Sequence, residues 1–227
     1  MNRMRAIALV ATAAGAAVAA VAVAGRDAAA QIGRRPVVNI GPSYWVGLSY
    51  GVLDGETIVD GNSGAEWQFG YSSQIRATFE KVLQPGFTGG LSAGFSTAPL
   101  TYSGGSVFNA ACGTCRADAD ITQWLAFIHG GGGGLRAYGF HGEFDLEGGV
   151  TSFSNFRVHD GGARLAPTNT NYDFTFGLGG GIGYSLSTDV DIYATEVADW
   201  VLHDQGENAT TSAPRIYTFR LGGRVGF

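Results

Sequence analysis

Apolar residues alternate with small or polar ones in repeated segments of this chain, and this period of two most limits its possible folds. In the last segment, "IYTFRLGGRVGF", Phe219 and Phe227 lie on one face of an extended chain, and Arg220 and Arg224 lie on the other. Such alternation is typical of a β-strand whose two faces meet different surroundings. Terminal residues of a domain usually fray. We therefore expect that neighbouring strands hold the end of this one.

Eight segments show this alternation or a related apolar pattern. The expected strands cover residues 43–52, 67–79, 87–95, 119–129, 138–150, 172–186, 190–201 and 215–227. The fourth and seventh have apolar residues on both phases, so the direction of their faces stays open. The 37 glycines are too many for a helical protein. The sequence predicts an all-β fold.

The connections between these segments alternate in length. Long ones cover residues 53–64, 97–118, 153–170 and 203–213, and short ones cover 81–86, 130–134 and 187–189. Long loops at one end and tight turns at the other are typical of outer-membrane barrels. We predict an eight-stranded antiparallel transmembrane up-and-down β-barrel, closed by pairing of the first and last strands. An extra hairpin within residues 130–149, which would make ten strands, remains an alternative.

The apolar face of each clear strand is expected to point outward. A soluble lipocalin-type barrel is the alternative, with apolar residues inside and charges outside. Here the polar face consists mainly of Gly, Ser and Thr, which suit a narrow interior. The aromatic residues expected to face the bilayer are Tyr44, Trp67, Phe79, Phe87, Tyr138, Tyr172, Tyr184 and Tyr217.

The N-terminal residues have the features of an export signal. A basic start, "MNRMR", precedes an apolar, alanine-rich run and a small-residue site that ends at Ala30. This pattern predicts a secretory signal peptide over residues 1–30 and a barrel domain over 31–227. A transmembrane anchor is the alternative, because the apolar run is nearly long enough to span a bilayer.

The charge of the chain argues against nucleic acid as a partner. The formal net charge is −5, and Lys81 is the only lysine. Phosphate binding needs basic patches, whereas a soluble domain of this size normally carries many lysines on its surface. We expect outer-membrane lipid to cover much of the surface.

With its signal peptide, eight alternating segments and final "RVGF", the chain resembles the small outer-membrane β-barrels of the OmpA transmembrane domain, OmpX and OmpW group. The resemblance implies export through the periplasm to the outer membrane. It also implies that the barrel assembly machinery reads the terminal strand. The residues that would form this assembly signal are Tyr217, Phe219, Leu221, Val225 and Phe227.

Charged residues on the polar faces are the main candidates for interior chemistry. The motif "HGEFDLE" places His141 with Glu143, Asp145 and Glu147 on the inward face of the fifth strand. General acid–base chemistry is one interpretation. An ion-pair network is favoured, because an unpaired charge in a narrow lumen is costly. Its expected members are Arg76, Glu143, Asp145, Glu147, Arg220 and Arg224, and at least one arginine is expected to pair with Glu143 or Asp145.

Three other motifs have simple structural interpretations. Cys112 and Cys115 of "CGTC" are expected to form a local disulfide, because zinc needs about four ligands and no second cysteine pair is present. The "HD" dipeptides at residues 159–160 and 203–204 are interpreted as solvated loop residues. The glycine run at 130–134 lacks the Lys and Ser or Thr of a phosphate-binding loop and indicates a flexible turn.

These observations favour a non-catalytic outer-membrane barrel with a polar, side-chain-filled lumen that is structural or presents loops to extracellular partners. No cofactor, metal or catalytic residue is expected. The alternatives are a narrow channel of OmpW type for small apolar molecules and, less favoured, an enzyme at the outer rim. Apolar residues lining the outer end of the lumen would favour the channel.

Overall fold

The computed structural model describes residues 41–55, 57–59, 64–104, 112–131, 139–159, 161–165, 170–203 and 215–227. The predicted signal peptide lies outside these residues. The strands are β1 Tyr44–Asp54, β2 Thr57–Val59, β3 Glu66–Phe69, β4 Ser72–Gln84, β5 Phe87–Ser103, β6 Thr114–Gly130, β7 Gly139–Val158, β8 Asn171–Ser185, β9 Val190–Leu202 and β10 Arg215–Gly226. Within the described part of the chain, no helix is long and apolar enough to cross a membrane.

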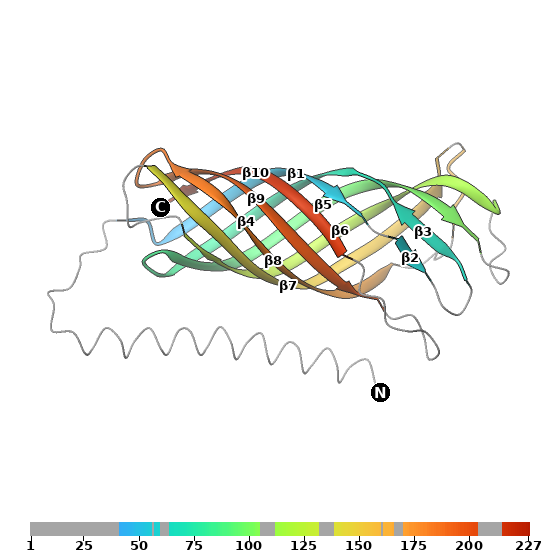
Figure 1. Ribbon diagram of the computed structural model, residues 1–227, viewed down its shortest axis with the longest axis horizontal. Helices are drawn as coiled ribbons and strands as arrows, with labels where there is room; N and C mark the ends of the chain where they lie inside the picture. The colour runs from blue at the N-terminus through green and yellow to red at the C-terminus, as the bar shows by residue number, and fades with distance from the viewer. Residues whose placement is uncertain are drawn as a thin grey trace, which may run out of the picture.

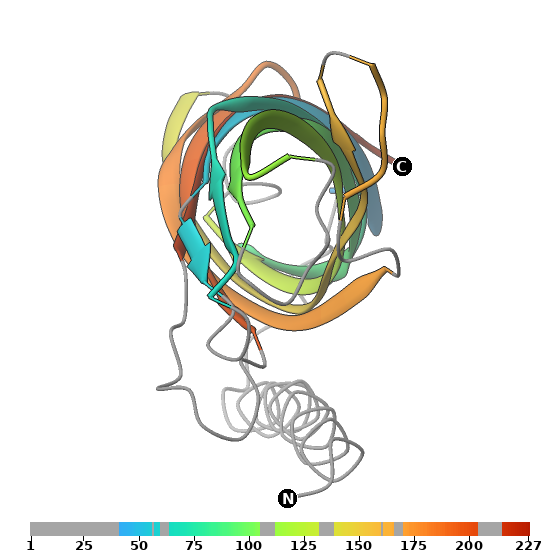
Figure 2. The ribbon, with the colours of Figure 1, turned by 90° about the vertical axis from the view of Figure 1, so that its right-hand side faces the viewer.

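Eight of these strands close into an antiparallel barrel (Figures 1 and 2). Around the ring the order is β1, β4, β5, β6, β7, β8, β9 and β10, and β10 pairs with β1 in a register that sets Tyr50 opposite Leu221. The short strands β2 and β3 form a hairpin that pairs with β5 beyond the ring. The predicted eight-stranded barrel and the pairing of its first and last strands are confirmed.

Both ends of the described chain lie at one end of the barrel, which we call the turn end. The Phe227 N–H donates to the Tyr44 carbonyl at 2.9 Å, and the two rings stack with centroids 6.0 Å apart. The short β4–β5 and β8–β9 connections are also at this end. The last residue is therefore held by the first strand, as the terminal alternation predicts. In outer-membrane barrels the end with the short turns faces the periplasm.

The opposite end, the loop end, projects much farther than the sequence predicts. β5 and β6 contain 17 residues each and β7 contains 20. At about 3.3 Å per residue and a tilt near 40°, the 17-residue strands rise roughly 40 Å along the axis, more than an apolar band of about 25 Å requires. The expected loops at 97–118 and 153–170 are wrong in part, because strand continues to Ser103, resumes at Thr114 and extends to Val158.

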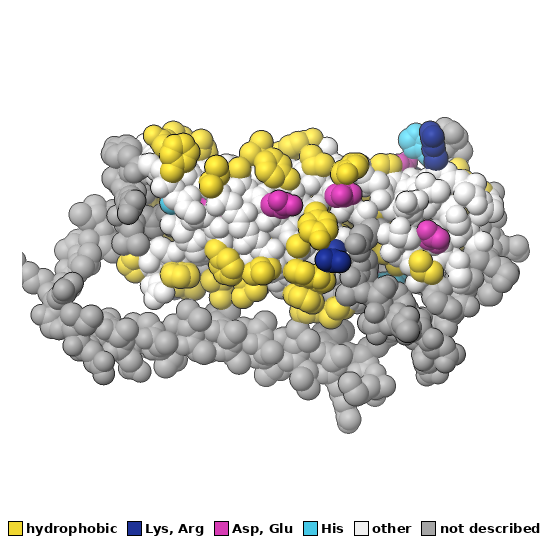
Figure 3. Space-filling view, viewed as in Figure 1, with side chains coloured by type: hydrophobic (Ala, Val, Ile, Leu, Met, Phe, Trp, Pro, Cys, Tyr) yellow, Lys and Arg dark blue, Asp and Glu magenta, His cyan; other side chains and the backbone are white. Residues whose placement is uncertain are grey.

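An apolar belt covers the outside of the barrel over the half that contains the C-terminus, whereas the projecting part shows few hydrophobic side chains (Figure 3). Of the predicted outward aromatic residues, Phe79, Phe87, Tyr172 and Tyr217 are exposed. Tyr184 packs edge-on against the exposed ring of Phe140, with ring centroids 4.9 Å apart. Tyr138 lies outside the described residues. The belt fits a bilayer as its surroundings.

The prediction for Trp67 is wrong. Its side chain is only 7% exposed and contacts Tyr102 inside the projecting part, with ring centroids 5.8 Å apart. The cause is an interruption at Gly70, where β3 ends before β4 begins and the Gly70 N–H donates to the Pro99 carbonyl. The burial pattern changes phase there, so Phe69 faces inward but Tyr71 faces outward.

Candidate functional site

The interior of the barrel has two layers with different chemistry. A polar, charged layer lies nearer the turn end, and an apolar layer lies nearer the loop end. Eight strands leave a lumen only wide enough for side chains. The candidate site is therefore what fills this lumen.

Glu147 of β7 is the centre of the first ion cluster. Its Oε1 accepts from Arg76 Nη1 at 3.2 Å and from Arg220 Nη2 at 3.1 Å, so one carboxylate pairs with two guanidinium groups. Arg220 also lies 3.8 Å from Asp199. All four side chains are almost completely buried. Because buried charges need partners, this cluster depends on all of its members.

Arg224 of β10 is the centre of the second cluster. Its guanidinium donates to Asp191 Oδ2 at 3.0 Å and to Glu80 Oε2 at 3.2 Å, and lies 3.6 Å from Glu143 Oε1. The guanidinium also lies 5.1 Å from the centre of the Trp45 ring, a cation–π distance. Four strands thus contribute side chains to one buried cation.

His129 of β6 joins the carboxylates of β7. It contacts Glu143 through Nε2 and Asp145 through Nδ1, the latter at 2.7 Å. His141 Nε2 lies 2.7 Å from the other oxygen of Glu143. The residues of "HGEFDLE" are therefore partners of arginine and histidine side chains. The structure places all six predicted network residues in these clusters, and the Arg224 and His129 groups share Glu143.

Glycines on inward positions make room for these long side chains. A β-carbon at Gly177 would overlap the Asp199 carboxylate, and one at Gly183 would overlap His141 and Glu143. The glycine-rich stretch of β8 therefore has a packing role. At the top of the charged layer, Gln74 donates to Gln123 at 2.8 Å.

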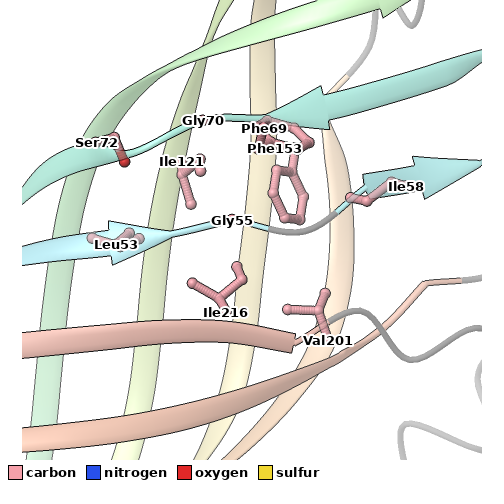
Figure 4. A pocket seen from close by; sticks show the side chains of 10 residues that line it. All are labelled: Leu53, Gly55, Ile58, Phe69, Gly70, Ser72, Ile121, Phe153, Val201 and Ile216. Carbon is pink, nitrogen blue, oxygen red and sulfur yellow. The ribbon is translucent and has the colours of Figure 1, made fainter.

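The apolar layer is a hydrophobic core inside the barrel. Phe69 and Phe153 pack with ring centroids 5.4 Å apart, and Ile121, Val201 and Ile216 point toward the same space (Figure 4). The pocket left between these side chains has free space for about one water molecule. The prediction of a polar lumen thus holds only for the part nearer the turn end.

The remaining predicted residues occupy the surface or the loop end. Cys112 and Cys115 are joined by a disulfide. His159 Nδ1 contacts Asp118 at 2.9 Å and His203 Nδ1 contacts Asp173 at 2.9 Å, so the two histidines use carboxylates of different strands. Their "HD" neighbours Asp160 and Asp204, and residues 132–134 of the glycine run, lie outside the described residues. Among those described, no group of three or more His, Cys, Asp or Glu side chains is arranged to hold a metal ion.

The predicted assembly residues share one row on the outer face of β10. Their side chains are all exposed. The members of the row are Tyr217, Phe219, Leu221, Val225 and Phe227. The row adjoins the seam with β1, at which the barrel closes.

Sequence reasoning missed several members of the clusters. Glu80 lies near the end of an expected strand, and His129 and Asp199 lie on the two strands whose facing was left open. Asp199 could have been found from the spacing of the acidic residues on its strand. Asp191 and Asp199 are an even number of positions apart, so they lie on the same face of β9, which faces inward. The apolar layer had no such signal.

Of the comparisons with known proteins, only the one with solved structures finds similar chains. No family model and no curated protein matches the chain. Among solved structures, the outer membrane protein OprG of Pseudomonas aeruginosa is 12% identical, with a TM-score of 0.51, over 82% of this chain and 97% of that one. Neisserial surface protein A is 13% identical, with a TM-score of 0.42, over 82% of this chain and 97% of that one. At these identities the likeness shows the fold alone. The chain has the fold of the small outer-membrane β-barrels, and its apolar belt agrees with location in that membrane.

Replacing Glu147 by glutamine should strongly destabilise the barrel. The change keeps the shape of the side chain but leaves Arg76 and Arg220 without their shared carboxylate, and breaking a buried pair typically costs about 3–5 kcal/mol. Urea unfolding of detergent- or lipid-folded protein measures the effect. Glu66→Gln, at an exposed position on β3, is the matched control and should leave the midpoint unchanged. Equal midpoints for both variants would contradict a structural role for the first cluster.

Proposed function

We propose that this protein is a non-catalytic outer-membrane barrel that is closed to ions and carries a rigid extension beyond the membrane. The observation that supports it is the filling of the lumen by two successive layers. Arg76, Arg220 and Arg224 pair with carboxylates in the first. The apolar core forms the second. The pockets among these side chains have free space for only one or a few water molecules, which is too little for a hydrated ion to pass without movement of the side chains.

The extension supports a role in presenting loops. β5, β6 and β7 continue beyond the belt as paired strands, and the core between Trp67, Tyr102 and Phe156 supports them. The disulfide lies at this end, next to the first residues of β6. Loops carried on such a base are held away from the lipid surface, where an extracellular partner can reach them.

A second candidate function is binding of small apolar molecules at the loop end. The apolar layer favours it, since the residues that line the pocket there, among them Phe69, Ile121 and Phe153, are hydrophobic. The space between them is small. Binding of an alkane-sized molecule would therefore require these side chains to move.

Planar-bilayer recording tests the closed barrel. Wild-type protein should give no ion current. Arg220→Ala should also remain closed, because the apolar core still blocks the lumen, whereas Arg220→Ala combined with Phe69→Ala and Phe153→Ala should leak. Heat-dependent migration in electrophoresis checks that each variant is folded. A steady current through the folded wild type would contradict the proposal.

We also propose that the outer face of β10 is read during assembly in the membrane. The support is the exposed row that ends at Phe227, together with the hydrogen bond and ring contact of Phe227 with Tyr44 at the closing seam. Deleting Phe227 should reduce recovery in the outer-membrane fraction several-fold. Phe87→Ala, which removes another exposed aromatic ring near the turn end, is the control and should be recovered normally. Normal recovery of the truncated chain would sink the assembly role.

A further inference from the structure

Glu196 places a carboxylate on the lipid-facing side of β9. Its side chain is exposed, whereas Thr195 and Val197 on either side are buried in the lumen. The outward row of this strand runs from Ile192 through Glu196 and Trp200 to Leu202, and the Trp200 ring stacks on Phe176 with centroids 5.2 Å apart. At about 2.5 Å of rise per residue in a tilted strand, Glu196 lies roughly 10 Å from Ile192 and roughly 15 Å from Leu202. It is therefore near the middle of the apolar belt.

The surroundings of Glu196 are mainly apolar and offer it no charged partner among the residues that the structure describes. Its register neighbours are Gly180 on β8 and Phe219 on β10. The diagonal neighbours are Leu178 and Ile182 on β8 and Tyr217 and Leu221 on β10, all exposed. Three of them are aliphatic, and the Tyr217 hydroxyl accepts a hydrogen bond from Arg215. No described residue forms a hydrogen bond or ion pair with the carboxyl group, in contrast to every charged side chain of the lumen clusters. An acidic group in hydrocarbon is costly unless it is neutralised or paired.

The surface around the Glu196 carboxyl group is also recessed. Gly180 and the outward-facing Ala194 and Ala198 adjoin Glu196 on β8 and β9, so large side chains stand back from it on that side. Between transmembrane helices, small residues allow two backbones to approach, and polar side chains between them form hydrogen bonds; the same physical reasons apply to two barrel surfaces. The two features occur together here.

We propose that the lipid-facing surface of β8 and β9 around Glu196 is the interface of a homodimer, in which the two Glu196 carboxyl groups share a proton. This inference rests on the proposed membrane location. In a closed, symmetric dimer of two copies inserted in the same direction, the two-fold axis runs along the membrane normal. Each residue near that axis then meets the same residue at the same depth.

A second copy is the occupant that fits this chemistry. A protonated carboxyl donates its O–H to the oxygen of the facing carboxyl, so glutamate is complementary to itself across the axis. A cationic partner would have to carry its charge to the same depth in the bilayer. Within the described chain, Lys81 and Arg215 lie near the ends of their strands, so a copy of this chain supplies no cation at that depth.

The test uses a cysteine beside the carboxyl group, which leaves Glu196 intact. Ala198→Cys protein in outer membranes, treated with a mild oxidant, should run as a disulfide-linked dimer on non-reducing electrophoresis. Ala93→Cys is the matched control, because Ala93 faces lipid on β5, four strands away around the ring. It should stay monomeric, as should the wild type, whose two cysteines are already joined.

The role of the carboxyl group is tested in the Ala198→Cys background. Adding Glu196→Leu should reduce the cross-linked fraction about tenfold, as expected for the loss of one hydrogen bond between two protein chains in a membrane. Glu196→Gln, which can still donate and accept, should retain it. A monomeric Ala198→Cys protein in the membrane, a product of another size, or cross-linking that is insensitive to Glu196→Leu would overturn the proposal. Absence of the wild-type protein from the outer-membrane fraction would instead refute the proposed function.

Discussion

Closure of the barrel between β1 and β10 is the constraint on which the rest of the structure depends. In a bilayer no water satisfies a free strand edge, so each backbone group must find a partner in the next strand. The ten Cα pairs between β1 and β10 supply the last edge. Once eight strands close, the interior is narrow and its contents must fit. Gly177 and Gly183, which leave room for the Asp199 and His141 side chains, are one consequence of this closure.

The two interior layers fill the lumen with different kinds of side chain. Within the belt, the residues facing lipid are apolar, so the lumen carries the polar residues and pairs their charges around Glu147 and Arg224. Beyond the belt the outer surface meets water, and the apolar residues turn inward to form an ordinary hydrophobic core. The change from one arrangement to the other occurs near the edge of the apolar belt that faces the loop end. It explains why the same strands are polar inside at one level and apolar inside at another.

The sequence predicted what depends on regular alternation. The closing strand, the number of strands in the barrel and the inward position of Arg76, Arg220 and Arg224 all follow from an unbroken period of two. The apolar layer at the loop end could not be predicted, because local irregularities in the strands change which residues face inward. At Gly70 the pairing strand is interrupted, so Trp67 and Phe69 face inward although they share the spacing of outward residues. At Asn155 the backbone has a φ of 60°, and its side chain donates to Asp120 at 2.8 Å, which brings Phe156 inside. The partners of each ion pair could not be predicted either, because they depend on which strands face one another across the lumen.

Water access to the interior tests the central claim, which is that the two layers together fill the lumen. Thr151 is fully buried beside Gln123, in the charged layer below the apolar core, and Glu66 is exposed at the loop end. Single cysteines at these two positions can be treated on intact cells with a small, charged, water-soluble thiol reagent. We expect that Glu66→Cys reacts quickly, whereas Thr151→Cys reacts only after the barrel is unfolded. Rapid labelling of Thr151→Cys in the folded protein would show a water-filled lumen and contradict the account.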